Sequence, residues 1–149
     1  MDEEKKSIGV LLDKDASLPF YASDGASGAD VYAHVTEEVI VFPGQSTLIP
    51  TGLYLEIPEG YEMQIRSRSG LALHHQVIVL NAPGTIDSDY RGEVKIVLIN
   101  HGRREFVIKP KMRIAQIVLT KFVRAHFVPR MTFSSTTFRG EGGFGHSGW

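Results

Sequence analysis

The sequence contains no cysteine and no apolar run long enough to cross a membrane. Without cysteine, the chain forms no disulfides, thiol nucleophiles or cysteine-ligated metal sites. A spanning helix needs about 20 consecutive apolar residues. The opening stretch MDEEKKSIGVLL is charged, and its apolar part is too short for a signal peptide. We therefore expect a cytoplasmic protein without a membrane partner, and leave a nuclear or viral setting open.

The sequence also has little excess of either charge, with 16 Lys+Arg against 17 Asp+Glu. Proteins that coat nucleic acid present strongly basic surfaces, so we expect no stable nucleic-acid binding. The chain has 149 residues, 42% of them apolar and 22% charged. That length and composition are typical of one globular domain with its own core.

Proline and glycine separate short segments that are rich in Val, Ile, Tyr and Phe, the pattern of a β-sandwich or barrel. Apolar and polar residues alternate over 53–58 and 61–66, which predicts half-buried strands. Residues 94–99 are apolar except for one lysine, which predicts a strand covered on both faces, and 114–123 predicts a long central strand. The fold predicted is therefore all-β, a jelly-roll-like antiparallel β-barrel.

Only one helix is expected, a short one over 70–73 with Ser69 as its N-cap. The end of the chain differs from the rest, because it is rich in Gly, Ser and Thr and poor in bulky apolar residues. This composition predicts a barrel domain over 1–133 and a flexible segment over 134–149. Residues 140–145 match the dinucleotide-binding pattern G-x-G-x-x-G. They lack the flanking strand and helix that give that pattern meaning.

Two polar clusters carry candidate chemistry. The first spans residues 87–92, DSDYRG, and leads into the apolar strand; such a loop can hold Asp87 as a general base. The alternative is a turn in which the Asp side chains bond their own backbone. The second cluster, RSRSG over 66–70, suits a phosphate, although a helix start with two solvated arginines explains it equally well. From the residues alone, the prediction is an anion- or nucleotide-binding β domain with hydrolysis as an option.

Five segments, taken in order, resemble the sequence motifs of the trimeric dUTP nucleotidohydrolases, or dUTPases. They are SGADV (27–31), RSGLA (68–72), GTIDSDYRGE (84–93), RIAQ (113–116) and RGEGGFGHSG (139–148). The resemblance covers nearly the whole chain. It implies a homotrimer of jelly-roll subunits whose active sites lie at subunit interfaces. It also implies Mg²⁺-assisted hydrolysis of dUTP to dUMP and pyrophosphate, which keeps uracil out of DNA and supplies dUMP for thymidylate synthesis.

The resemblance implies catalytic roles for three residues. Asp87 would activate a water for in-line attack on the α-phosphorus. Ser69 would help to stabilise charge on the reacting group. Mg²⁺ would be held by substrate phosphates and waters, without direct protein ligands, and Asp30 would contact its water shell.

The resemblance also implies a substrate-binding set. Asn81 and the hairpin backbone would read uracil, and Tyr90 would pack under the deoxyribose. The C-terminal segment would form a lid, with Arg139 and Ser147 on the γ-phosphate and Phe144 stacked on uracil. The full set is Arg68, Ser69, Gly70, Asn81, Gly84, Thr85, Ile86, Asp87, Tyr90, Lys95, Gln116, Arg139, Phe144, Gly145 and Ser147.

Two rival interpretations share the fold. In the dCTP deaminase branch the catalytic glutamate falls where this chain has Val97, and an aliphatic side chain transfers no proton. A non-catalytic nucleotide-binding module on the same scaffold has no need of the complete motif set. Two local departures from the family pattern stand out. Ser67 replaces a common proline, and Lys111-Met112 replaces Gly-Asp. The second departure predicts a non-glycine residue at positive φ or a changed hairpin.

Overall fold

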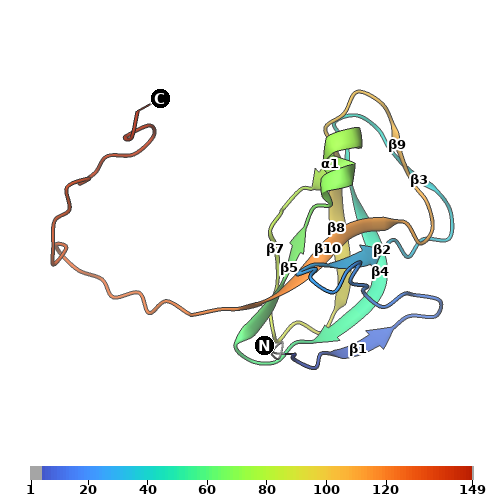
Figure 1. The fold of residues 1–149 in the computed structure, drawn as a ribbon, viewed down its shortest axis with the longest axis horizontal. Helices are drawn as coiled ribbons and strands as arrows, with labels where there is room; N and C mark the ends of the chain where they lie inside the picture. Colours follow the sequence, from blue (N-terminus) through green and yellow to red (C-terminus); the bar gives the residue numbers. More distant parts are fainter. Residues whose placement is uncertain (1–4, 149) are drawn as a thin grey trace.

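The computed structural model describes residues 5–148, so residues 1–4 of the predicted barrel segment and Trp149 of the predicted flexible segment lie outside it. The body contains two four-stranded sheets and a two-stranded one (Figure 1). The first sheet has the order β1 (Gly9–Leu12), β4 (Ser46–Glu56), β8 (Glu93–Asn100), β6 (Val77–Val79). The second has the order β2 (Ala29–Tyr32), β10 (Arg113–Lys121), β5 (Tyr61–Arg66), β7 (Gly84–Ile86). The small sheet pairs β3 (Val39–Val41) with β9 (Phe106–Ile108).

The predicted fold class is confirmed. Every pair of strands in the part of the chain described is antiparallel. The strands enclose one cluster of buried aliphatic side chains, and α1 (Ser69–His75) is the one helix in residues 5–148. None of the described residues belongs to a helix that is long and apolar enough to cross a bilayer.

Alternation along β4, β5 and β8 places the core. Leu53, Leu55 and Ile57 are buried as predicted, and so are Met63 and Ile65. The alternating pattern therefore located these half-buried segments correctly.

The prediction that residues 94–99 are covered on both faces is wrong. Val94, Ile96 and Leu98 are buried, but Val97 and Ile99 on the other face are only half-buried. The reason is that Val97 pairs with Leu48 of β4, which is 55% exposed, so this face of the sheet is open to solvent in residues 5–148.

The short helix begins one residue differently from the prediction. Arg68, not Ser69, is the N-cap; its backbone is extended and its side chain makes no capping hydrogen bond. The Arg68 carbonyl accepts the first helical bond from the Ala72 N–H at 3.1 Å. Ser69 is thus already helical, which rules it out as the cap.

The turn before β10 contains the predicted non-glycine residue at positive φ. Lys111 has φ 62°, and the Met112 N–H donates to the Lys109 carbonyl at 3.1 Å. With Pro110 at the second position, this is a type II turn, which normally has glycine at the third. Lys111 therefore stands where the family usually has glycine, and the cost is local backbone strain.

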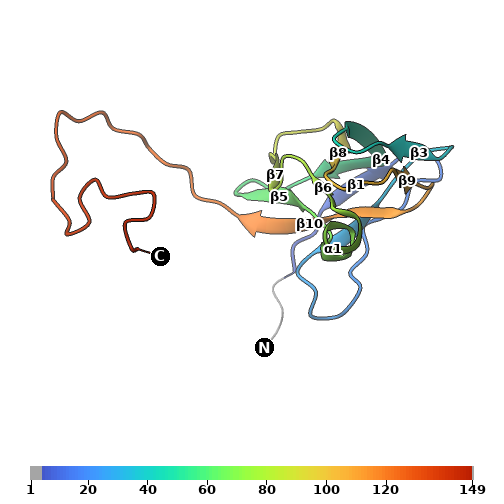
Figure 2. The ribbon, with the colours of Figure 1, turned by 90° about the horizontal axis from the view of Figure 1, so that it is seen from above.

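Residues 122–148, called the arm below, follow β10 and contain no helix or strand. Figures 1 and 2 show the arm leaving the sheets and running away from them. Phe122, next to β10, is 37% exposed, but the other phenylalanines of the arm are almost fully exposed: Phe127, Phe133, Phe138 and Phe144. The division into domains at residue 133 stays a prediction.

Candidate active site

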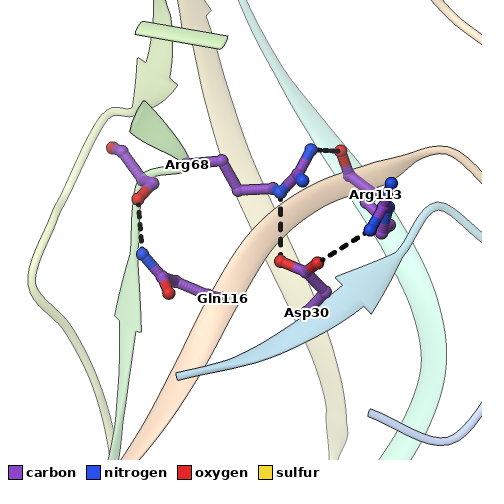
Figure 3. Close-up of polar contacts among 5 residues, drawn as sticks. Asp30, Arg68, Arg113 and Gln116 are labelled. Atoms are coloured by element: carbon purple, nitrogen blue, oxygen red, sulfur yellow. Dashed lines mark hydrogen bonds and ion pairs between the residues drawn. The ribbon is translucent and has the colours of Figure 1, made fainter. Parts of the chain in front are cut away.

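Four side chains from three elements meet at the start of α1 (Figure 3). We call them the Asp30 cluster: Asp30 on β2, Arg68 at the helix start, and Arg113 and Gln116 on β10. The register brings them together because Gln116 lies opposite both Asp30 on β2 and Arg66 on β5. Residues far apart in sequence therefore face one another at one edge of the second sheet.

The carboxylate of Asp30 is buried and holds two arginines. The distance from Arg68 Nε to Oδ1 is 3.0 Å, and that from Arg113 Nη1 to Oδ2 is 3.4 Å. Arg68 Nη1 also donates to the Arg113 carbonyl at 3.2 Å. A guanidinium has five N–H donors in a fixed plane, so the bonds through Nε and Nη1 leave Nη2 of Arg68 for an anion. Asp30 thus orients Arg68 before any ligand arrives.

Ser67 links this cluster to the first sheet, a role that sequence reasoning missed. Its carbonyl accepts from Gln116 Nε2 at 3.1 Å, and its hydroxyl accepts from the Val79 N–H at 2.9 Å. Beside it, Ser69 and Gly70 are exposed at the first turn of α1. The N–H groups there have no partner within the helix. The cluster therefore combines guanidinium, amide and hydroxyl donors suited to phosphate oxygens.

A second group surrounds a cleft of about 320 Å³, called the base pocket below. It contains six of the predicted site residues: Asn81, Thr85, Ile86, Asp87, Tyr90 and Lys95. Pairing of Gly84 with Ile65 aligns β7 beside β5, and a cis Ala82–Pro83 bond lies in the segment between Asn81 and β7. Gly84 itself is buried, and a Cβ atom there would lie 3.2 Å from the side-chain nitrogen of Asn81 and 3.2 Å from Cβ of Ile65.

The carboxylate of Asp87 has no hydrogen-bond or ion-pair partner within residues 5–148, and it is exposed at the pocket. A backbone turn does form, since the Tyr90 N–H donates to the Asp87 carbonyl at 3.1 Å. The Arg91 guanidinium stabilises the turn by donating to the Ser88 carbonyl at 2.7 Å. The turn interpretation therefore explains the backbone but leaves the Asp87 carboxylate available for chemistry.

Glu93 supports the wall of the base pocket and was not predicted as a site residue. Its Oε1 accepts from the Gly52 N–H at 3.0 Å, and its Oε2 lies 3.6 Å from Lys95 Nζ. The Tyr90 hydroxyl donates to the Glu93 carbonyl at 2.9 Å. No sequence signal marks the bond to Gly52, because the partner lies in another strand.

Asp87 of the base pocket and the Asp30 cluster lie toward opposite ends of β5. Ile86 pairs with Met63, so Asp87 falls beyond Met63, whereas Ser69 follows the other end of the strand at Arg66. The three residue steps from Met63 to Arg66 alone span about 10 Å. One chain therefore does not bring Asp87 and Ser69, two of the three predicted catalytic groups, to the same phosphorus.

The predicted lid residues lie on the arm and away from both groups (Figures 1 and 2). Arg139 Nε donates to the Gly142 carbonyl at 2.7 Å within the arm, and Phe144 is fully exposed with φ 42°. Gly145 and Ser147 follow it. Contact between these residues and a nucleotide stays a prediction.

No group of three or more His, Asp or Glu side chains within residues 5–148 is arranged to hold a metal ion. The carboxylates of Asp30, at the Asp30 cluster, and of Asp87, at the base pocket, are oxygen donors of the kind that suits Mg²⁺ or its water shell. Glu93 also lines the base pocket, but its carboxylate is engaged by the Gly52 N–H and by Lys95.

Comparison with known proteins agrees with the motif pattern. The sequence profile of the dUTPase family matches residues 14–148. The deoxyuridine 5'-triphosphate nucleotidohydrolase of Chlamydia pneumoniae is 57% identical over 137 residues, which is 92% of this chain and 94% of that protein. The Chlamydia caviae enzyme of the same name is 55% identical over 144 residues, 95% of this chain and 98% of its own. The Staphylococcus bacteriophage 80alpha dUTPase solved with dUpNHpp superposes with a TM-score of 0.83 at 26% identity, covering 97% of this chain and all of that one. The chain belongs to the dUTPase family.

Proposed function

We propose that this chain hydrolyses dUTP to dUMP and pyrophosphate, which keeps uracil out of DNA and supplies dUMP for thymidylate synthesis. The observation that supports this best is the base pocket, where Asn81, Asp87 and Tyr90 converge in a chain of this family. The phage relative with the same fold binds dUpNHpp, an analogue of the triphosphate.

Asp87 acts as the general base in this proposal. Its carboxylate is exposed and has no partner within residues 5–148, so it is free to accept a proton from a water. The water then attacks the α-phosphorus in line with the departing pyrophosphate. Ser69 stands at the exposed helix start, where its hydroxyl can donate to an oxygen of the reacting group.

The Asp30 cluster binds the phosphates. Arg68 is already oriented by Asp30, and Gln116 is held by the Ser67 carbonyl, so neither side chain has to be ordered by the ligand. Ser69 and Gly70 add backbone N–H groups at the first turn of the helix.

The base pocket recognises deoxyuridine. Asn81, Thr85 and Ile86 line this pocket, and in the proposal the Asn81 amide and the backbone of residues 81–86 offer donors and acceptors to the uracil edge. Cytosine in the same place leaves these groups unpaired, which makes its rejection strong. The ring of Tyr90 packs under the sugar and leaves no room for a 2'-hydroxyl.

A Mg²⁺ ion bound with the triphosphate supplies neutralisation of its negative charge. Asp30 is the residue proposed to face the waters of that ion. Its two oxygens also carry Arg68 and Arg113, so the same carboxylate orients cationic side chains beside the phosphates.

The working site is assembled between subunits of a homotrimer. This part of the proposal is supported by the register of β5, because Asp87 and Ser69 lie toward opposite ends of that strand. A second copy supplies the missing group, and an arm closes over the nucleotide with Arg139, Phe144 and Ser147. The exposed aromatic side chains of the arm need such a surface in order to leave water.

Deamination is disfavoured by the position of Val97. It lies on β8, on the same face as Lys95, and carries no group that can transfer a proton. A carboxylate would be needed there for the loss of an amine.

Pyrophosphate release, measured side by side with dUTP, dCTP, dTTP and UTP, tests the proposal. We expect strong preference for dUTP. Equal turnover of dUTP and dCTP would contradict the base-reading role of the pocket, and equal turnover of dUTP and UTP would contradict the packing of Tyr90 under the sugar.

A further inference from the structure

Several glycines of this chain lie directly under a predicted site side chain. A Cβ atom added at Gly92 would meet the ring of Tyr90, and one added at Gly28 would meet the amide of Gln116. By contrast, a Cβ at Gly25, Gly70 or Gly143 would meet nothing within 4 Å. At Gly28 and Gly92 the atoms in the way belong to predicted site side chains, whereas at Gly9, Gly52 and Gly142 they belong to residues outside the predicted set.

The ring of Tyr90 occupies the space that a side chain at residue 92 would need. An ideal Cβ on Gly92 would lie 2.6 Å from Cζ and 2.9 Å from Cε2 of that ring, and it would also collide with the hydroxyl. These distances are far below van der Waals contact. The same hydroxyl donates to the Glu93 carbonyl, so the ring is held from one side by a hydrogen bond and fits closely over the glycine on the other.

Gly28 stands in the same relation to Gln116. An ideal Cβ on Gly28 would lie 3.0 Å from Cδ of Gln116 and would collide with its Oε1. The amide nitrogen of Gln116 donates to the Ser67 carbonyl, so the side chain is held between that carbonyl and the bare backbone of Gly28.

Conformational freedom does not explain these glycines. Neither Gly28 nor Gly92 has a positive φ, so alanine can adopt the backbone conformation of either. The atoms that would collide belong to the outer part of mobile side chains, and Tyr90 is 46% exposed. An added methyl group is therefore expected to displace the site side chain and to leave the backbone intact.

We propose that Gly92 and Gly28 are positioning residues, which seat Tyr90 and Gln116 and so set sugar selectivity and phosphate binding separately. The inference rests on the proposed function, because it assigns Tyr90 to the deoxyribose and Gln116 to the phosphates. It adds that sugar selectivity and phosphate binding each depend on the absence of a side chain at one position outside the substrate-contacting set.

The test is a crossed comparison of Gly92→Ala and Gly28→Ala in the full chain, with Gly25→Ala as the matched control. For each variant, kcat and KM are measured with dUTP and with UTP, and thermal unfolding is recorded at one protein concentration. We expect Gly92→Ala to lower the dUTP:UTP ratio of kcat/KM by about tenfold or more. Gly28→Ala should raise KM for both nucleotides and leave their ratio unchanged, and Gly25→Ala should match the parent chain.

Double variants separate positioning from a general structural effect. If Gly92 acts through the ring, Tyr90→Ala/Gly92→Ala has the same nucleotide ratio as Tyr90→Ala alone, because no ring remains to be displaced. The same holds for KM in Gln116→Ala/Gly28→Ala. Should Gly92→Ala also lower the Tm, the double variant restores it by removing the collision.

Full additivity in both pairs would overturn the inference, and so would an unchanged ratio in Gly92→Ala. These results differ from failure of the proposed function, in which the parent chain itself releases no pyrophosphate from dUTP.

Discussion

The body and the arm of this chain differ in the surroundings of their charged and apolar side chains. In the body, the cationic Arg68 has a carboxylate partner at 3.0 Å and the apolar side chains form one buried cluster. In the arm, Arg139 bonds only a nearby carbonyl, and Phe138 and Phe144 are fully exposed. Both regions carry residues of the family motifs. Stability and function are therefore distributed differently along the chain. The body buries an apolar core of its own, whereas the side chains of the arm become buried only if another surface covers them.

The largest effect is expected within the body, at Asp87. Asp87→Asn removes the proton acceptor but keeps the size of the side chain, so turnover should fall by about 10²–10⁴-fold while nucleotide binding is kept. Pyrophosphate release and equilibrium binding of dUTP measure the two quantities. Unchanged turnover would remove Asp87 from the mechanism.

Truncation after Phe138 tests the arm directly. Because residues 139–148 run away from the sheets (Figure 1), the Tm should stay within about 2 °C of that of the full chain and the proposed trimer should persist. Turnover should fall by about a hundredfold, as expected when a closing element is lost. Loss of the folded trimer, or full activity, would each contradict the division between body and arm.

Two arginines give a matched comparison of the regions. Arg68→Ala leaves the buried Asp30 with one cationic partner, so it should lower stability by about 1–3 kcal/mol as well as activity. Arg139→Ala should lower activity alone, since its bond is exposed and local. Denaturant unfolding measures the change in stability of both variants, and kcat/KM measures the change in their activity. Equal losses of stability would show that the arm contributes to the fold.

The smallest effect is expected at the turn before β10. Lys111→Gly removes the strain of a non-glycine residue at φ 62°, about 1–2 kcal/mol, and adds about 0.5–1 kcal/mol of backbone entropy cost. The net gain should be about 0.5–1 kcal/mol, seen as a slightly higher Tm with unchanged kcat/KM. A lower Tm would mean that the Lys111 side chain contributes contacts that offset its backbone strain.

The sequence predicted the body well where burial is regular. Alternation located β4 and β5, and one apolar run located β10, because a half-buried strand leaves a period of two in its own residues. The sequence predicted less where contacts with other parts of the chain determine the local structure. Ser69 was assigned as the cap because its type favours that position, but the first helical bond starts at Arg68. Val97 and Ile99 were predicted to be covered because they are apolar, yet no layer in residues 5–148 covers that face.

The candidate site shows the same limit. Motif order pointed to Asp87, Tyr90 and Asn81, and the structure gathers these residues at one pocket. The support from Glu93 to Gly52 joins strands 41 positions apart, and no local pattern contains it. The positioning roles of Gly28 and Gly92 were equally absent from the sequence pattern. A missing side chain can be interpreted only when the neighbouring group that occupies its space is known.

The pairing of β2 with β10 has a consequence for synthesis. Asp30 lies opposite Gln116, so one strand of the second sheet is made near the beginning of the chain and its neighbour near the end. At 5–20 residues per second the earlier strand waits several seconds on the ribosome for that neighbour. An interrupted chain that stops before residue 113 keeps an open strand edge with no complement to close it, and is prone to aggregate.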